Sequence, residues 1–203
     1  MDFYLDIYFP LLFVFMAVFF LYIGIKVIVS KRPLLFPSKI FFIFMLLAFS
    51  PQFIMSFERF ASPTFLDMGI ILYISPLMFV VILAFMWIQM KGYMAIGISD
   101  NSFRNAIHYS LNKNQIEFEE QLSLIKLTSI KSELQVAVQS WVGTGQLKLK
   151  KSKDKDLMFN LISSINEYYT SNTIKPNNIT SIFYIVMGGF MLIFASSSYF
   201  FTR

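Results

Sequence analysis

The sequence predicts an α-helical membrane protein with four transmembrane helices and a small α+β domain inserted before the last of them. Hydrophobic residues make up 56% of the chain and charged residues only 14%. A soluble domain has roughly 45–50% apolar and about 25% charged residues, so this chain carries more apolar surface than a soluble fold would bury. The apolar residues fall into four runs, and a long polar segment separates the third run from the fourth.

The four apolar runs are the expected transmembrane helices, since a spanning helix takes ~20 mostly apolar residues. They cover residues 7–29, 40–57, 68–90 and 179–201. We therefore divide the chain into a part with three transmembrane helices, residues 1–90, an inserted domain, residues 91–176, and a part with the fourth helix, residues 177–203. The N-terminus lacks the basic stretch and the cleavage site of a signal peptide, so we expect the first helix to stay in the mature protein.

The distribution of basic residues predicts the orientation, because short cytoplasmic loops are enriched in Lys and Arg. The loop after the first run contains no acidic residue, and its basic residues are Lys26, Lys31, Arg32 and Lys39. We place this loop and the inserted domain in the cytoplasm and both termini outside. The Ile-, Lys-, Asn- and Phe-rich composition indicates a bacterial protein, and we expect it in the plasma (inner) membrane.

The inserted domain has the residue pattern of an antiparallel sheet with two helices on one face. The pattern predicts a strand at 93–98, a helix from Ser99 or Asp100 to Asn114, strands at 116–119 and 122–127, a hairpin from 134 to 149, and a helix from 156 to 168. Gly143-Thr144-Gly145 marks the turn of the hairpin; the segment lacks the Gly-Lys-Ser/Thr ending of a phosphate loop.

Both ends of the domain lead into the membrane. Only a few residues, including Lys91 and Gly92, separate the third apolar run from the first strand, which predicts a stiff entry. The exit, residues 170–180, is polar, and we expect it to be looser. The domain should therefore sit close to the inner leaflet.

A run of lysines is the most distinctive charged feature of the domain. It consists of Lys148, Lys150, Lys151, Lys153 and Lys155. Clusters of basic residues near the cytoplasmic surface attract anionic lipids at about 1 kcal/mol per residue. We expect membrane lipids as partners and no nucleic acid, because no aromatic platform or recognition motif accompanies these lysines. A solvated strand end is the alternative.

The sequence predicts no catalytic, cofactor-binding or metal site. The chain has no cysteine and one histidine, His108, which lies off the centre of the apolar face of its predicted helix. Glu117, Glu119 and Glu120 could form an acid–base or metal site, but they also fit a solvated face of a strand. We expect neither a metal nor a cofactor.

Three features of the apolar runs bear on mechanism. Pro51 and Pro76 each follow a serine within a run and could kink the helices. Gly188 and Gly189 are small residues of the kind that lets helices approach closely, within the chain or between copies. The four runs contain no Asp, Glu or His, which argues against an ion-coupled transporter.

These observations favour a non-enzymatic membrane protein whose cytoplasmic domain binds a partner protein, an anionic lipid or a small ligand. Such a protein would act as a sensor, scaffold or accessory subunit, and a protein partner or a homo-oligomer is expected. One alternative is a pore or membrane-perturbing effector gated by the domain. Another is an enzyme that acts on a lipid or a lipid-linked substrate.

Overall fold

The computed structural model of the chain describes residues 2–61, 71–121, 124–151 and 155–201. Within these ranges, only the backbone is described for residues 2–6, 52, 56–61, 71–76, 155 and 199–201. Lys153 therefore lies outside the described residues, and the side chains of Pro76 and Lys155 lie outside the described part.

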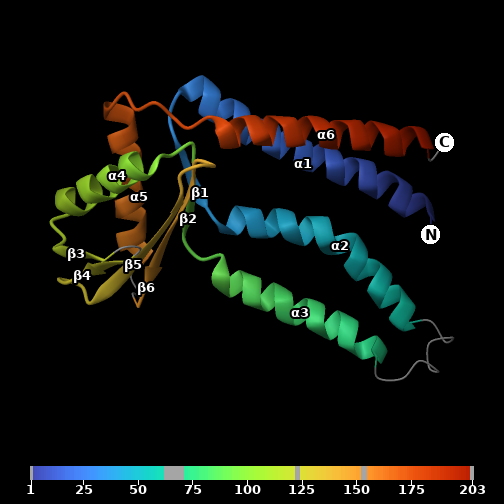
Figure 1. The fold of residues 1–203 in the computed structure, drawn as a ribbon. Coiled ribbons are helices and arrows are strands. Elements are labelled where there is room, and N and C mark those ends of the chain that lie inside the picture. Colours follow the sequence, from blue (N-terminus) through green and yellow to red (C-terminus); the bar gives the residue numbers. More distant parts are fainter. Residues whose placement is uncertain (1, 62–70, 122–123, 152–154, 202–203) are drawn as a thin grey trace.

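The fold combines helices with one antiparallel sheet, as Figure 1 shows. The elements are α1 (Asp2–Ser30), β1 (Leu34–Pro37), α2 (Lys39–Ala61), α3 (Ile71–Gln89), β2 (Tyr93–Ile96), α4 (Asp100–Lys113), β3 (Phe118–Gln121), β4 (Leu124–Leu127), β5 (Ser132–Gln139), β6 (Thr144–Lys150), α5 (Lys155–Ser171) and α6 (Ile179–Phe201). The mixed α+β character of the fold agrees with the prediction.

The sheet has six strands in the order β1-β2-β6-β5-β4-β3, and every neighbouring pair is antiparallel. The β5–β6 hairpin forms because apolar and polar residues alternate along both strands, which gives the sheet one apolar face. Leu134 lies opposite Leu149, and Val136 lies opposite Leu147, on this face. The neighbouring positions Gln135 and Lys148 pair on the other face.

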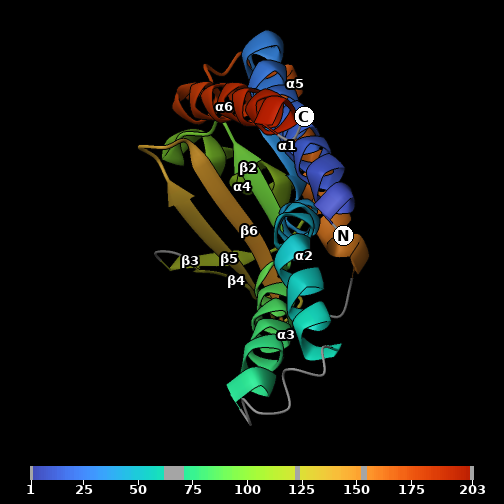
Figure 2. The same cartoon turned by 90° about the vertical axis from the view of Figure 1, so that its right-hand side faces the viewer.

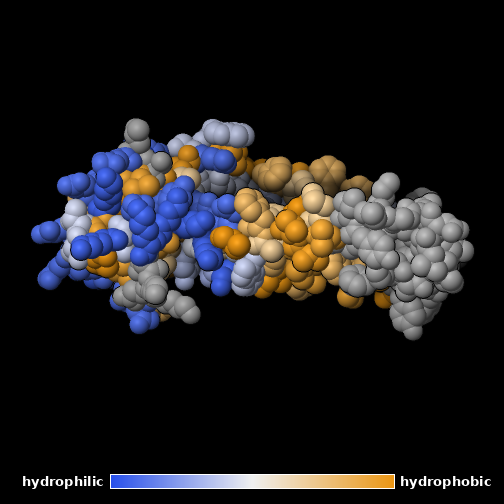
Figure 3. Space-filling view, turned by 90° about the horizontal axis from the view of Figure 1, so that it is seen from below, coloured by the Kyte–Doolittle hydropathy of each residue, from blue (hydrophilic) through white to orange (hydrophobic). Residues whose placement is uncertain are grey.

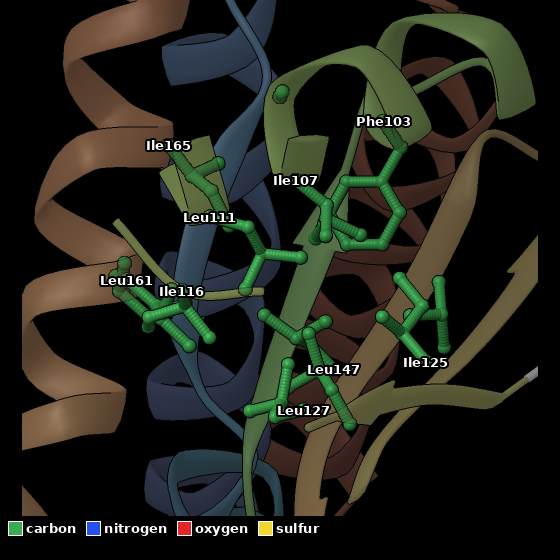
Figure 4. Close-up of a cluster of buried hydrophobic side chains, with 14 of the residues drawn as sticks. Phe103, Ile107, Leu111, Ile116, Ile125, Leu127, Leu147, Leu161 and Ile165 are labelled. Atoms are coloured by element: carbon green, nitrogen blue, oxygen red, sulfur yellow. The ribbon is translucent and has the colours of Figure 1, made fainter. Parts of the chain in front are cut away.

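Helices α4 and α5 cover the apolar face and enclose the main core, which Figure 4 shows in close-up. Phe103, Ile107 and Leu111 recur at helical spacing along α4 and are fully buried. Leu161 and Ile165 reach the same core from α5. Helical spacing after Leu161 and Ile165 predicts Tyr168 on the buried face of this helix, but the structure buries its neighbour Tyr169 there and leaves Tyr168 half-buried.

The start of α4 follows from a local signal in the sequence. Ser99 is the N-cap residue, and its side chain accepts a hydrogen bond of 3.3 Å from the backbone N–H of Ser102. The Ser102 side chain accepts one of 3.1 Å in return from the backbone N–H of Ser99. This reciprocal capping box satisfies two backbone donors that a helix start otherwise leaves unpaired.

The opposite face of β1 and β2 packs on the long helices. Ile23 and Val27 of α1, Phe36 of β1 and Ile96 of β2 form a second buried cluster. Seen along the helices in Figure 2, strands β3 to β6 extend to one side of α1, α2 and α3. Helices α4 and α5 cover one face of these strands. The other, uncovered face is turned toward the side from which the long helices extend (Figures 1 and 2).

The long helices form two pairs, α1 with α6 and α2 with α3 (Figure 1). Aromatic contacts mark each pair: the rings of Phe20 and Tyr184 stack at 5.5 Å between α1 and α6, and Phe53 contacts Phe79 at 5.1 Å between α2 and α3. Figure 3 shows a hydrophobic surface over the helices beside a hydrophilic surface over the domain.

Two helices are long and apolar enough, among the described residues, to cross a membrane: Ile7–Ser30 and Ile179–Ser198. The apolar stretches described in the other two, Lys39–Pro51 and Leu77–Gln89, are shorter. The first and last predicted spans thus meet the length and composition criteria, whereas the second and third stay predictions.

An ion pair between α4 and α5 gives a pH-dependent prediction. Glu167 pairs with Lys113 and accepts a hydrogen bond of 3.3 Å from the Tyr109 hydroxyl. The hydrogen bond from Lys113 lowers the pKa of Glu167. A carboxylate whose pKa is lowered by folding stabilises the fold above its unfolded pKa, and this contribution is lost as the pH falls through the folded pKa. We expect Glu167→Gln to lower the melting temperature slightly at neutral pH and by progressively less in acid.

Thermal melting from neutral pH down to the acid range measures this difference. Glu117→Gln is the control, because Glu117 is exposed and forms no ion pair among the described residues. If Glu167→Gln lowered the melting temperature by the same amount at every pH, the ion pair with Lys113 would not be the source of the stabilisation.

Candidate functional site at the junction of sheet and helices

Strand β1 joins the loop between the first two long helices to the domain sheet. Leu34 pairs with Ile96 and Pro37 with Tyr93, so the loop supplies an edge strand next to β2. The sequence predicts only a basic loop for this segment, so the strand departs from the prediction. A four-residue apolar stretch between Pro33 and Ser38 was the available signal, but a strand this short is indistinguishable from an apolar loop.

The entry to the domain is as tight as the sequence predicted. Gly92 lies in the short connection between α3, which ends at Gln89, and β2, and it has a φ of +107°, which favours glycine. A Cβ atom on Gly92 would overlap the carbonyl oxygen of Leu147 on β6. The Gly92 carbonyl accepts a 3.0 Å hydrogen bond from the backbone N–H of Ser38, so the end of α3 is tied to the start of α2.

The exit from the domain is anchored, in contrast to the looser linker expected from its polar sequence. The backbone N–H of Asn177 donates to the Gly97 carbonyl at 3.0 Å, and its side-chain amide donates to the Ser140 carbonyl at 2.8 Å. The side-chain oxygen of Asn177 accepts a 3.1 Å hydrogen bond from the backbone N–H of Ile179, as an N-cap side chain does. One residue thus links the β2–α4 connection, the β5–β6 turn and the start of α6.

The predicted lysine cluster is spread over different environments. Lys148 lies on the uncovered face of the sheet and donates a 3.4 Å hydrogen bond to the Gln89 carbonyl at the end of α3. Lys151 forms an ion pair with Glu133. The hydrogen bond from Lys151, together with the charges of Lys150 and Lys126, lowers the pKa of Glu133. Part of the positive charge is therefore balanced within the sheet.

Other basic residues gather where the long helices meet the sheet. Lys26 donates a 2.8 Å hydrogen bond to the Tyr22 hydroxyl, and the Lys39 ammonium lies 4.9 Å from the centre of the Trp87 ring. Lys31 and Arg32 are exposed in the turn between α1 and β1. Lysines with an aromatic neighbour at a helix end are typical of a membrane interface, where the apolar stem and the charged head meet different surroundings.

His108 belongs to a cluster of interacting side chains on the surface. Its position off the apolar face of the helix predicts a solvated histidine, but the structure gives it two side-chain partners. Its Nε2 lies 2.8 Å from the Glu120 carboxylate, and its ring lies 5.1 Å from the Phe118 ring. Arg104 pairs with the same carboxylate and, at 3.2 Å, with Asp100. The cluster fastens α4 to edge strand β3.

Of the three acidic candidates from the sequence, Glu120 contacts His108, whereas Glu117 and Glu119 do not share a pocket with it. A shallow hollow of about 400 Å³ lies next to Glu117 and is lined by Asn112, Gln115, Ile116, Glu117 and Phe118. Glu119 lies on the uncovered face opposite Lys126. In the part of the chain that the structure describes, no three His, Cys, Asp or Glu residues gather as metal ligands would.

The two predicted kink sites lie within helices. Pro51 is buried in α2, and Figure 1 shows that α2 curves along its length. The preceding Ser50 donates to the Leu47 carbonyl at 2.5 Å and also bonds the Tyr8 hydroxyl of α1. Pro76 lies within the bounds of α3. Any role of these prolines in a moving element stays a prediction.

The two predicted packing glycines have different surroundings. Gly188 is buried against α1, and a Cβ atom there would lie 2.7 Å from Leu21 Cγ. A Cβ atom on Gly189 would have no neighbour within 4 Å. Gly24 of α1 makes the reciprocal close approach, since its Cβ atom would lie 2.6 Å from the Ser181 carbonyl oxygen of α6. Gly24 carries no signal of this packing role in the sequence, because it is a single glycine within an apolar run.

Comparisons with known proteins give no relative: no protein-family model, no curated protein and no solved structure matches this chain. The class of the protein therefore rests on its own fold and on the junction described above.

Proposed function

We propose that the chain is a non-enzymatic membrane protein that crosses the bilayer four times and carries its α+β domain on the cytoplasmic side. In this proposal the domain binds a partner protein, an acidic lipid or a small ligand and transmits the effect to the helices. The observation that carries it is the attachment of all four helices to one sheet. Strand β1 connects α1 with α2, β2 follows α3, and Asn177 holds the start of α6.

This attachment favours a sensor, scaffold or accessory subunit over a domain that is only tethered. A binding event that shifted β2 or the β5–β6 turn would act on α3 or α6 without a flexible linker between them. Packed interfaces have discrete arrangements, so small shifts at a binding surface can become helix movements. The second buried cluster, with Val27 of α1 against Ile96 of β2, supplies such an interface.

The orientation is supported by the position of the charges. Basic residues lie at the sheet-side ends of the helices, whereas the two termini lie at the far ends (Figure 1). Enrichment of Lys and Arg on the cytoplasmic side then puts the sheet inside and both termini outside.

Labelling of single cysteines tests the four-span arrangement, and the natural chain has no cysteine to remove. Thr64→Cys falls in the segment between α2 and α3, and Asn101→Cys falls on the exposed start of α4. We expect a membrane-impermeant maleimide to label Thr64→Cys in intact cells and Asn101→Cys only after permeabilisation. If only α1 and α6 crossed the bilayer, both cysteines would be protected in intact cells, and the four-span proposal would be wrong.

Photocrosslinking tests the binding role. A benzophenone maleimide attached at Asn101→Cys or Asn172→Cys samples the exposed surface of the domain, and Val186→Cys on α6 is the matched helix control. We expect the domain positions to give a discrete adduct in native membranes, identified by mass spectrometry as protein, lipid or small ligand. A domain surface without any adduct would contradict the proposal.

The pore alternative has less support. The groove of about 510 Å³ between α1 and α2 is lined almost entirely by apolar side chains, including Leu11, Phe15 and Leu47. Such a lining suits acyl chains better than water or ions. The enzyme alternative would need polar groups that converge on a pocket, and the hollow beside Glu117 includes neither His108 nor Glu119.

A further inference from the structure

The turn between β5 and β6 presents an exposed tryptophan. Trp141 lies in the four-residue turn after Gln139, whose carbonyl accepts hydrogen bonds from Val142 at 3.1 Å and Gly143 at 2.9 Å. The Trp141 side chain is 78% exposed. A large aromatic ring left in water forfeits the free energy that its burial would provide, so a surface that covered Trp141 would gain that free energy.

The turn is held firmly beside the point where α6 begins. The Gly143 carbonyl accepts hydrogen bonds from Gly97 at 2.8 Å and Ile98 at 3.1 Å. On its other side, the turn receives the Asn177 amide at the Ser140 carbonyl. A Cβ atom on Gly143 would lie 2.8 Å from the Asn177 side chain, which shows how closely the two segments pack. Trp141 therefore has a fixed position relative to α6.

The position of the turn identifies the partner. The side chain of Asn177 bonds the backbone N–H of Ile179 at the start of α6, and Ile179 is 56% exposed. Among the described residues, α6 is one of two helices long and apolar enough to cross a membrane. In Figure 1 the β5–β6 turn reaches the level at which α6 starts. At that level a spanning α6 enters the headgroup layer, where Trp is enriched because its ring is apolar and its N–H group still reaches water.

We propose that Trp141 inserts into the headgroup layer of the bilayer that α6 crosses and so anchors the β5–β6 turn to the cytoplasmic leaflet. The partner is phospholipid, contacted at the boundary between headgroups and acyl chains. The proposal rests on the membrane placement given under the proposed function, and it adds a second contact between domain and bilayer. Through Asn177, this contact would couple lipid packing at the surface to the start of α6.

Tryptophan fluorescence tests the proposal, because the chain has only two tryptophans. Trp87→Phe leaves Trp141 as the reporter, and Trp141→Phe leaves Trp87, which is 45% exposed in α3 and contacts Phe42. Each full-length variant is reconstituted into phosphatidylcholine–phosphatidylglycerol vesicles and exposed to nitroxide-labelled lipids or to aqueous iodide. We expect blue-shifted Trp141 emission that loses most of its intensity to shallow nitroxide lipids and little to iodide.

The outcome for Trp87 separates this inference from the membrane placement itself. If lipid quenches Trp87 and iodide alone quenches Trp141, the insertion of Trp141 is wrong while the membrane placement stands. If lipid quenches neither tryptophan, both are wrong. Blue-shifted Trp141 emission that responds to neither quencher would indicate a protein contact and would also overturn the inference.

Discussion

Gly92→Ala should detach the sheet from α3 and lower stability more than the other substitutions considered for this chain. Gly92 has a φ of +107°, a conformation that a residue with a Cβ atom adopts only under strain. The added Cβ atom would also overlap the backbone carbonyl of Leu147, which cannot move without disturbing the β2–β6 ladder. Backbone strain of this kind costs roughly 1–3 kcal/mol, and the overlap adds to it, so we expect a loss of at least about 2 kcal/mol.

Thermal melting of the full-length protein in detergent measures this effect. Lys91→Ala is the matched control, since Lys91 is exposed and immediately precedes Gly92. Surface changes of that kind usually stay within about 0.5 kcal/mol. Equal melting temperatures for the two variants would show that residue 92 can carry a Cβ atom without strain. The tight connection described between α3 and β2 would then be wrong.

The parts of the domain that the sequence predicted well depend on local periodicity. Leu134 and Val136 alternate with polar residues because one face of β5 is buried, and Phe103, Ile107 and Leu111 recur at helical spacing because α4 has one buried face. Ser99 could be recognised as a cap because its hydrogen bond to Ser102 lies within the same short segment. Each signal requires only neighbouring residues.

The junction could not be predicted because its contacts are non-local. Strand β1 forms only because β2, far along the chain, offers a free edge with which Leu34 and Pro37 can pair. Asn177 looked like part of a polar linker, and its role follows from three carbonyl and amide partners brought together by the finished sheet. A polar residue that forms hydrogen bonds to distant parts of the chain gives no periodic signal in the sequence.

The same limit applies to Trp141. The sequence marks a hairpin turn at Gly143-Thr144-Gly145, but a turn signal does not say whether the neighbouring Trp141 ring is packed or exposed. Contacts between residues far apart in the chain, such as the hydrogen bond between Asn177 and Ser140, place the turn beside α6 and make the exposure of the ring informative.

Gly188→Val should separate α1 from α6, whereas Gly189→Val should leave the pair intact. A side chain at Gly188 would meet Leu21 Cγ at 2.7 Å and the Ala17 carbonyl oxygen at 3.1 Å, so the helices would have to move apart. Overpacking of a close contact typically costs about 1–3 kcal/mol. Gly189 is the ideal control because it is the neighbouring glycine in the same helix and has open space around its Cβ position.

Melting temperatures of the two variants in detergent, compared with the unmodified chain, test this asymmetry. A second substitution, Gly24→Val, should reproduce the effect of Gly188→Val, since Gly24 makes the reciprocal approach to the Ser181 carbonyl oxygen. If Gly189→Val were instead the harmful change, its open side would be occupied in the assembled protein. That result would place a second copy or a partner helix on α6 and shift the role of these glycines from packing within the chain to assembly between chains.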